Sequence, residues 1–329
     1  MTTSVLVTGG DGYVGHALTA SLAADPSGLT TIVSTDIREP AAPLGGVTYA
    51  VADVRDPGLA DLLTKHSVDV VVHLAAIVTP GRKPNRELEY SVDVEGTRNV
   101  LESCLVAGVR KIIVSSSGAA YGYHADNPDW IDEDDALRGN KEFAYSDHKR
   151  LVEEMLARWR EEHPELEQLI FRSGTILGTD THNQITDLFD RSVIMGVIGS
   201  PTPFVFIWDR DVVGAIRQGV LNDATGIYNL AGDGAMALAD IAGRMDKRYI
   251  PLPASVIGGA LRVLRAVRAT QYGPEQVDFL RYRPVLSNRR LKEEFGYVPQ
   301  LSTSEVFDRF WRARSKSGEQ RAETKMSGD

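Results

Sequence analysis

A tyrosine and a lysine four positions apart, Tyr145 and Lys149 in the stretch AYSDHK, are spaced so that they could act together. The residues after them carry apolar side chains at helical spacing, namely Leu151, Val152, Met155, Leu156 and Trp159. On a helix, positions 145 and 149 lie on one face, and an ammonium beside a phenol favours the ionised phenol. A surface pair is the ordinary alternative, because one such spacing is weak evidence by itself.

A glycine-rich loop, VTGGDGYVG, follows the first strand-like segment and opens a helix-like one. Gly10, Gly12 and Gly15 match a dinucleotide-binding pattern, and a second pattern in the same stretch starts at Gly9. Such glycines permit a tight turn, close approach of backbone N–H groups to a pyrophosphate, and packing of helix on strand. The helix N-terminus that follows favours negative charge. The loop therefore predicts a dinucleotide site.

Asp36 ends the next strand-like segment, where a carboxylate can accept hydrogen bonds from an adenosine ribose. Its charge would repel the 2′-phosphate of NADP, so we predict NAD. NADP remains the alternative cofactor, because the guanidinium of Arg38 could bind that phosphate. Asp53 has two interpretations of equal weight, an adenine contact or the N-cap of the following helix.

The elements that must position these residues alternate in the first half of the chain. Strand-like segments rich in Val and Ile lie at 4–8, 31–35, 47–51, 68–75, 111–117 and 168–173. Helix-like segments lie at 13–24, 57–65, 86–107 and 143–162. This alternation predicts an α/β fold with a Rossmann-type doubly wound parallel sheet, followed by a smaller, mostly helical C-terminal substrate domain.

The second half has a looser pattern. We expect helices near 185–196, 211–221, 236–245, 255–269, 275–283, 288–295 and 303–314, and short strands at 205–208 and 227–230. Residues 1–174, joined by 204–231, would form the dinucleotide-binding domain. Residues 175–203 and 232–314 would form the substrate-binding region, and the polar tail 315–329 would be disordered.

Composition excludes several classes of function. The chain has 329 residues, a net charge of −9 and a single cysteine, Cys104. We expect no disulfide, no nucleic-acid partner, no signal peptide and no membrane span, and a reducing, cytoplasmic location. Neither the seven histidines nor the acidic loop 126–135 has metal-ligand spacing, so we expect no metal.

Taken together, these residues resemble the extended short-chain dehydrogenase/reductase family, also called the NAD-dependent epimerase/dehydratase family. The resemblance covers roughly residues 4–300 and rests on the number, order and spacing of its motifs. They are TGGDGYVG (8–15), Asp36, DV (53–54), HLAA (73–76), EGTRNVLE (95–102), VSSSGAAYG (114–122), Tyr145-x-x-x-Lys149, FRSGTILG (171–178) and FIWDRDVVGAI (206–216).

The resemblance implies roles for these residues. Tyr145 would be the acid/base, Lys149 would support it and bind the nicotinamide ribose, and Ser117 would polarise the substrate oxygen, with Ser115 and Ser116 as competitors. A phenol titrates near ~10, so its pKa must fall, which Lys149 and an oxidised nicotinamide both favour. Thr175 would also meet the substrate. The expected cofactor contacts are Gly9, Gly10, Asp11, Gly12, Tyr13, Val14, Gly15, Asp36, Ile37, Arg38, Asp53, Val54, Leu74, Ala75, Ala76, Val114, Ser115, Tyr145 and Lys149.

The chain departs from the family pattern at several positions. Asp93 stands where many relatives carry an asparagine that helps to hold the proton relay. The sequence does not decide whether Asp93 takes over this role. Phe204 stands where nucleotide-sugar enzymes often carry an arginine, and Thr175 where they often carry asparagine. Three arginines are candidates to replace the lost one, namely Arg172, Arg191 and Arg210. His148 is expected to be a bystander.

The segment 251–273 allows three interpretations. Its apolar residues alternate with arginines at positions 262, 265 and 268, which predicts an amphipathic helix packed on the domain. The other two are a lid over an apolar substrate and a helix on a membrane surface.

The function implied by the resemblance is NAD-dependent hydride transfer between nicotinamide and a secondary alcohol or ketone carbon of a small molecule. A nucleotide-sugar epimerase or dehydratase with tightly bound NAD is the first alternative, and a non-catalytic dinucleotide sensor is the second. A homodimer through the helices near 86–107 and 143–162 is also implied.

Overall fold

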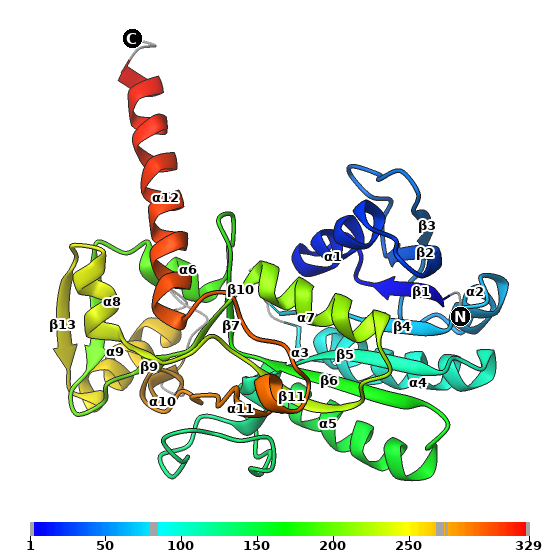
Figure 1. The fold of residues 1–329 in the computed structure, drawn as a ribbon. Helices are drawn as coiled ribbons and strands as arrows, with labels where there is room; N and C mark the ends of the chain where they lie inside the picture. The colour runs from blue at the N-terminus through cyan, green and yellow to red at the C-terminus, as the bar shows by residue number, and fades with distance from the viewer. Residues whose placement is uncertain (1–2, 79–84, 268–272, 274–275, 327–329) are drawn as a thin grey trace.

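A seven-stranded parallel sheet forms the centre of the computed structural model, which describes residues 3–78, 85–267, 273 and 276–326. The strand order is β11-β6-β5-β4-β1-β2-β3 (Figure 1). The strands are β1 (Thr3–Thr8), β2 (Leu29–Asp36), β3 (Thr48–Val51), β4 (Val70–His73), β5 (Lys111–Ser117), β6 (Glu167–Ser173) and β11 (Gly226–Leu230). All six strands expected in the first half are present. The order confirms the Rossmann-type sheet.

Helices cover both faces of the sheet, as parallel crossovers require. One core lies under α1 (Tyr13–Ala24), α7 (Asp209–Leu221) and α11 (Arg289–Glu293). The opposite core lies under α2 (Leu59–Lys65), α4 (Gly96–Ala107) and α5 (Ala144–Glu162). Strands β4 and β5 contribute alternate side chains to the two cores, for example Val70 and Val71, which explains their nearly continuous apolar sequence.

The segment around residues 204–231 rejoins the sheet. Strand β11 pairs in parallel with β6 at the edge, and α7 packs into the same core as α1. Strand β10 (Phe206–Trp208) lies outside the main sheet and pairs with β7 (Thr175–Leu177). Both short strands expected here are therefore present.

A third core belongs to the C-terminal part of the chain. It packs α6 (Gln184–Phe189), α8 (Leu238–Arg244) and α12 (Thr303–Met326) around an aromatic cluster, with β9 (Pro203–Phe204) and β12 (Met236–Ala237) paired beside it. The aromatic cluster consists of Phe189, Phe204, Phe206, Phe307 and Phe310.

The helix expected at 185–196 is wrong in its second half. It stops with α6 at Phe189, and β8 (Val193–Val197) pairs with β13 (Arg248–Leu252), a strand we did not expect. A short apolar run fits a strand or a buried helix equally well, and pairing between segments far apart in the chain is not visible in local periodicity. Strand β13 carries Pro251, which is tolerated because β13 pairs on one side with β8.

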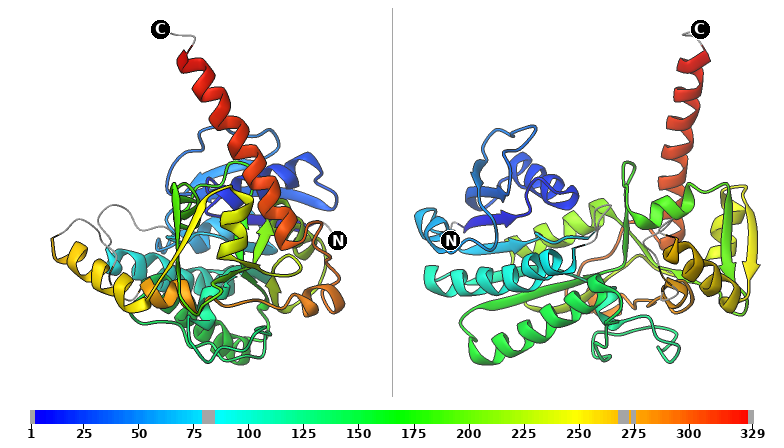
Figure 2. Two further views of the ribbon diagram at one scale, coloured as in Figure 1. Left: turned by 90° about the vertical axis from the view of Figure 1, so that its left-hand side faces the viewer. Right: turned by 180° about the vertical axis from the view of Figure 1, so that it is seen from behind.

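The last helix also differs from expectation. Instead of ending near residue 314, α12 continues to Met326, into the segment for which we expected no structure. That segment is polar but rich in Lys, Glu, Gln, Arg and Ala, which favour helices. The end of α12 projects from the body of the molecule (Figure 2).

Candidate active site

The glycine loop connects β1 to the N-terminus of α1. Gly9 has a φ of +68°, and a Cβ there would lie 2.8 Å from the backbone nitrogen of Ala75. A Cβ on Gly15 would lie 2.1 Å from the carbonyl oxygen of Gly9, so both positions require glycine. With Gly12 at its N-cap, α1 presents its free N–H groups at the carboxyl edge of the sheet.

Asp36 lies at the end of β2, directly beside this loop. Its Oδ2 accepts from the backbone N–H of Asp11 at 3.1 Å, and its Oδ1 from that of Ile37 at 2.8 Å. Ile37 and Arg38 are exposed at the same edge. The carboxylate is thus held next to the N-terminus of α1, where the ribose of a dinucleotide would lie.

Asp53 is not a helix N-cap, so that interpretation is wrong. Helix α2 starts at Leu59 and its N-cap is Gly58. Asp53 instead forms an ion pair with Arg55, with Nη2 to Oδ2 at 2.6 Å. The hydrogen bond from Arg55 is the main reason that the pKa of Asp53 is lowered.

A cavity of about 590 Å³ joins the glycine loop to the Tyr145–Lys149 pair. The predicted site residues that line it are Gly9, Gly12, Tyr13, Val14, Gly15, Leu74, Ala76, Ser115, Ser117, Tyr145, Lys149 and Thr175. Asp36 and Asp53 do not belong to the cavity lining that the described residues form. Seven further predicted cofactor contacts also lie outside this lining, namely Gly10, Asp11, Ile37, Arg38, Val54, Ala75 and Val114. Val54 and Val114 are buried in the core under α2, α4 and α5.

Tyr145 and Lys149 share one face of α5, as their spacing predicts. Lys149 Nζ lies 5.8 Å from the ring centroid of Tyr145 and donates to the carbonyl oxygen of Ser115 at 2.9 Å. Ser117 ends β5 beside them, and its Oγ accepts from the backbone N–H of Ala119 at 3.1 Å. The three candidate proton-transfer residues therefore meet at the carboxyl end of β5.

Burial governs the ionisation of this group. Burial has the largest effect on Tyr145 and raises its pKa. The Asp93 carboxylate also raises this pKa, whereas a hydrogen bond with Ser117 lowers it. Burial also lowers the pKa of Lys149, against the opposing effects of Asp93 and Glu153. The protein by itself therefore holds Tyr145 as a neutral phenol.

Asp93 lies in a π-helical turn, Ser91–Glu95, between α3 (Arg86–Tyr90) and α4. Single π-turns of this kind are frequent at functional sites. Its Oδ1 accepts from the backbone N–H of Ile77 at 2.8 Å, and its Oδ2 lies 3.2 Å from Nδ1 of His148. His148 is only 1% exposed and is therefore not a bystander on the helix surface.

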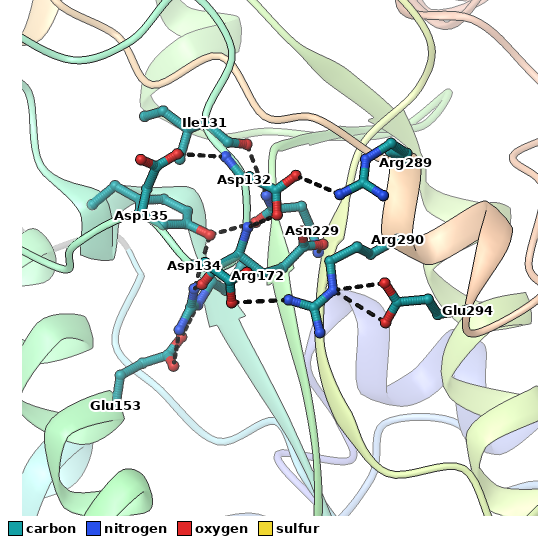
Figure 3. Close-up of polar contacts among 12 residues, drawn as sticks. Ile131, Asp132, Asp134, Asp135, Glu153, Arg172, Asn229, Arg289, Arg290 and Glu294 are labelled. Carbon is teal, nitrogen blue, oxygen red and sulfur yellow. Dashed lines mark hydrogen bonds and ion pairs between the residues drawn. The ribbon is translucent and has the colours of Figure 1, made fainter.

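Arg172 is not available to a substrate either. Its guanidinium binds both oxygens of Glu153, at 2.9 and 3.0 Å, inside a network buried behind the site (Figure 3). The network continues through Tyr121 and Asn229 to Glu133. Ser116 donates to Glu153 at 2.6 Å, which turns this serine away from the role of Ser117.

The acidic loop 126–135 supplies partners for arginines. Asp126 pairs with Arg138. Asp132 pairs with Arg289 and Asp134 with Arg290, both arginines of α11 (Figure 3). In the described part of the chain, no group of three or more His, Cys, Asp or Glu residues is arranged to hold a metal ion.

Arg283 is a cavity residue that sequence reasoning missed. Its guanidinium carbon lies 4.1 Å from the ring centroid of Phe204, and its Nη2 donates to Thr175 Oγ1 at 3.3 Å. Its Nη1 is buried without a hydrogen-bond partner among the described residues. Arg191 and Arg210, the other candidates from the sequence, do not belong to the lining that the described residues form. No spacing motif marks position 283, so only the fold identifies it.

The arrangement suits NAD. The cavity connects a helix N-terminus, which accepts a pyrophosphate, to a buried Tyr–Lys pair, which can move a proton near a nicotinamide. None of the helices in residues 3–78, 85–267 and 276–326 combines the length and the apolar composition needed to cross a bilayer.

Comparison with known proteins identifies relatives of this chain by sequence. The model of the NAD dependent epimerase/dehydratase family matches residues 5–200, more than half of the chain. An uncharacterised protein of Mycobacterium tuberculosis is 24% identical over 94% of this chain and 84% of its own length. The N-acetyl-alpha-D-glucosaminyl-diphospho-ditrans,octacis-undecaprenol 4-epimerase of Escherichia coli O157:H7 is 26% identical over 94% of both chains.

Solved structures share the fold. The UDP-glucose 4-epimerase of Thermotoga maritima with UDP-glucose superimposes with a TM-score of 0.74 at 16% identity, covering 96% of this chain and 99% of the other. The UDP-glucose 4-epimerase of Thermus thermophilus in complex with NAD gives a TM-score of 0.71 at 21% identity, covering 94% and 98%.

Proposed function

Because the chain belongs to the NAD-dependent epimerase/dehydratase family and is an NAD-dependent enzyme, we propose that it oxidises and re-reduces a secondary alcohol carbon of a phosphate-linked sugar. The observation that carries this proposal is the guanidinium of Arg283, which lies in the same cavity as Tyr145 and Lys149 and whose buried Nη1 has no hydrogen-bond partner among the described residues. A buried cation without a carboxylate favours an anionic ligand.

The chain's own residues divide the chemistry. Tyr145 Oη takes the proton from the substrate hydroxyl, and Ser117 Oγ holds that oxygen by a hydrogen bond. Bound NAD would supply the hydride acceptor for the carbon that carries this hydroxyl. Since burial raises the pKa of Tyr145, the phenolate forms only when positive charge from Lys149 and the oxidised nicotinamide is present.

Arg283 and Thr175 hold the far end of the substrate. Arg283 lies over the ring of Phe204, at the position where nucleotide-sugar relatives often place an arginine. A guanidinium supplied from residue 283 can therefore replace the one missing at residue 204. The relatives' names support a sugar diphosphate, whose carrier is a nucleotide in one and a polyprenyl lipid in another.

A net dehydrogenase that releases NADH is the second candidate. Phe204 and Thr175 favour it, since both depart from the residues common in nucleotide-sugar enzymes. The two candidates differ in how firmly the cofactor is held. Purified protein should carry NAD that survives gel filtration and is not consumed over many turnovers of UDP-glucose or a related sugar diphosphate. Stoichiometric release of NADH would instead establish the dehydrogenase.

We also propose the division of the chain expected from its sequence. Residues 1–174 with 204–231 bind NAD, and residues 175–203 with 232–314 bind the substrate. A two-fold dimer would pair α3, α4 and α5 with their copies, which the exposed side chains of Leu88 and Tyr90 support. Light scattering at micromolar concentration measures this assembly directly, and a monomer would contradict it.

A further inference from the structure

Helix α9 (Ala254–Ala266) leaves most of its apolar surface in solvent. Val256, Val263, Leu264 and Val267, the residue after its end, have exposed fractions of 53%, 64%, 44% and 66%. Positions 256, 260, 263, 264 and 267 lie on one face of a helix, so these side chains form a continuous stripe. A stripe of this kind is uncommon on a protein surface unless it binds something.

The face of α9 next to the stripe holds the helix to the protein. Ile257 is 8% exposed and packs with Val197 and Val277 in a small core, which Leu261 joins. The helix is therefore packed on the domain by one narrow face, as its amphipathic pattern predicts, and the stripe beside that face remains exposed. Figure 2 shows α9 at the outer end of the C-terminal region, away from the central sheet.

The charge around α9 is opposite in sign to that of the whole chain. Residues 248–274 contain four arginines and no Asp or Glu, in a protein of net charge −9. Arg248, Arg262 and Arg265 are exposed. Arg262 and Arg265 lie on the side of α9 away from the stripe, so the helix combines an apolar face with a basic polar face. This combination matches the boundary of a bilayer of acidic phospholipids, which is apolar on the acyl-chain side and anionic at the headgroups.

Two other occupants fit less well. No described residue of α9 belongs to the cavity lining, so nothing supports a lid over the substrate. A second copy of the chain would bring the same arginines close together across a two-fold axis, where their like charges repel.

We propose that the apolar stripe of α9 and its arginines form a docking surface for anionic membranes. The stripe enters the boundary between headgroups and acyl chains, while the arginines lie at headgroup level. The protein would then bind the membrane peripherally and reversibly, and added salt would weaken this binding. This surface does not depend on the proposed reaction.

Sedimentation with vesicles tests the proposal. The full chain should bind vesicles of phosphatidylcholine mixed with phosphatidylglycerol, bind pure phosphatidylcholine far more weakly, and lose affinity as salt increases. Combining Val256→Ser, Val263→Ser and Val267→Ser, or Arg262→Glu with Arg265→Glu, should each weaken binding about tenfold or more. Val298→Ser with Lys65→Glu makes matched changes at exposed sites elsewhere and should leave binding unchanged.

A fluorophore gives a second, independent readout. Cys104 is fully buried, so a Leu264→Cys protein can be labelled at the stripe alone. Its emission should shift to the blue on contact with anionic vesicles. The proposal is overturned if the wild-type protein does not bind these vesicles at low salt, or if the α9 variants bind them with wild-type affinity. It is also overturned if the valine variants instead break a dimer seen by light scattering.

Discussion

The carboxylate of Asp93 and the imidazole of His148 form a buried pair next to Tyr145, with Oδ2 and Nδ1 3.2 Å apart. Asp93 raises the pKa of Tyr145 and opposes the fall in the pKa of Lys149. It also acts to raise the pKa of His73, but burial dominates there and lowers that pKa to about 3. Asp93 therefore acts on the pKa values of Tyr145 and Lys149 although it does not belong to the cavity lining.

Asp93→Asn should move the pH dependence of kcat/KM to lower pH. The asparagine keeps an oxygen for the N–H of Ile77 but loses the negative charge, so the pKa values of Tyr145 and Lys149 both fall. A pH–rate profile of the variant measures the shift. Exposed Asp61→Asn, on α2, is the control. Superimposable profiles would show that Asp93 has only a structural role.

Tyr145→Phe should retain the fold and NAD binding but slow hydride transfer about 10²–10⁴-fold, the usual contribution of a positioned acid/base. Lys149→Met should additionally weaken NAD binding, because the ammonium serves both the phenol and the nicotinamide ribose. Single-turnover absorbance and separate NAD titrations distinguish the two effects. Tyr123→Phe, which removes another buried hydroxyl from the cavity lining, is the control. Wild-type turnover by Tyr145→Phe would remove this residue from the mechanism.

Asp36→Ala should narrow the difference between NAD and NADP affinity. The carboxylate lies beside the N-terminus of α1 and would repel a 2′-phosphate, so wild-type protein should prefer NAD. Calorimetric titration with both cofactors measures the preference. Arg38→Ala in the Asp36→Ala background should then weaken NADP again if Arg38 receives the phosphate. Equal affinities in the unmodified protein would contradict the assignment.

Glu133→Gln should alter how stability depends on pH. Burial raises the pKa of Glu133 from the ordinary value of 4.5 to about 7, because Glu133 lies inside the network around Arg172. A raised pKa in the folded state means that the stabilising contribution is complete below pH 4.5 and is lost as pH rises through about 7.

The variant does not titrate at position 133, so its melting temperature should exceed that of wild type by more at pH 8 than at pH 5. Its amide oxygen can still accept from the backbone N–H of Asn229. Thermal unfolding across this range, with exposed Glu161→Gln as the control, measures the difference. A constant difference at all pH values would show that Glu133 does not titrate there.

The sequence by itself determined the sheet, the glycine loop and the Tyr145–Lys149 pair. Each is encoded locally: alternating Val and Ile runs, glycines that no side chain can replace, and two residues one helical turn apart. The predicted preference for NAD over NADP rests on Asp36, a residue that ends one predicted strand. These features need only short-range geometry, so the prediction of the Rossmann-type fold was confirmed.

Contacts between side chains far apart in the chain depend on the folded arrangement of the elements. Arg283 reaches Thr175 across 108 positions, and His148 reaches Asp93 across 55. Pairing of β8 with β13 likewise depended on partners far along the chain, and a short apolar run has no local feature that names its partner. Helical periodicity predicted that α9 is amphipathic, but which of its faces packs and which remains exposed was set by the surfaces that the rest of the fold brings to it.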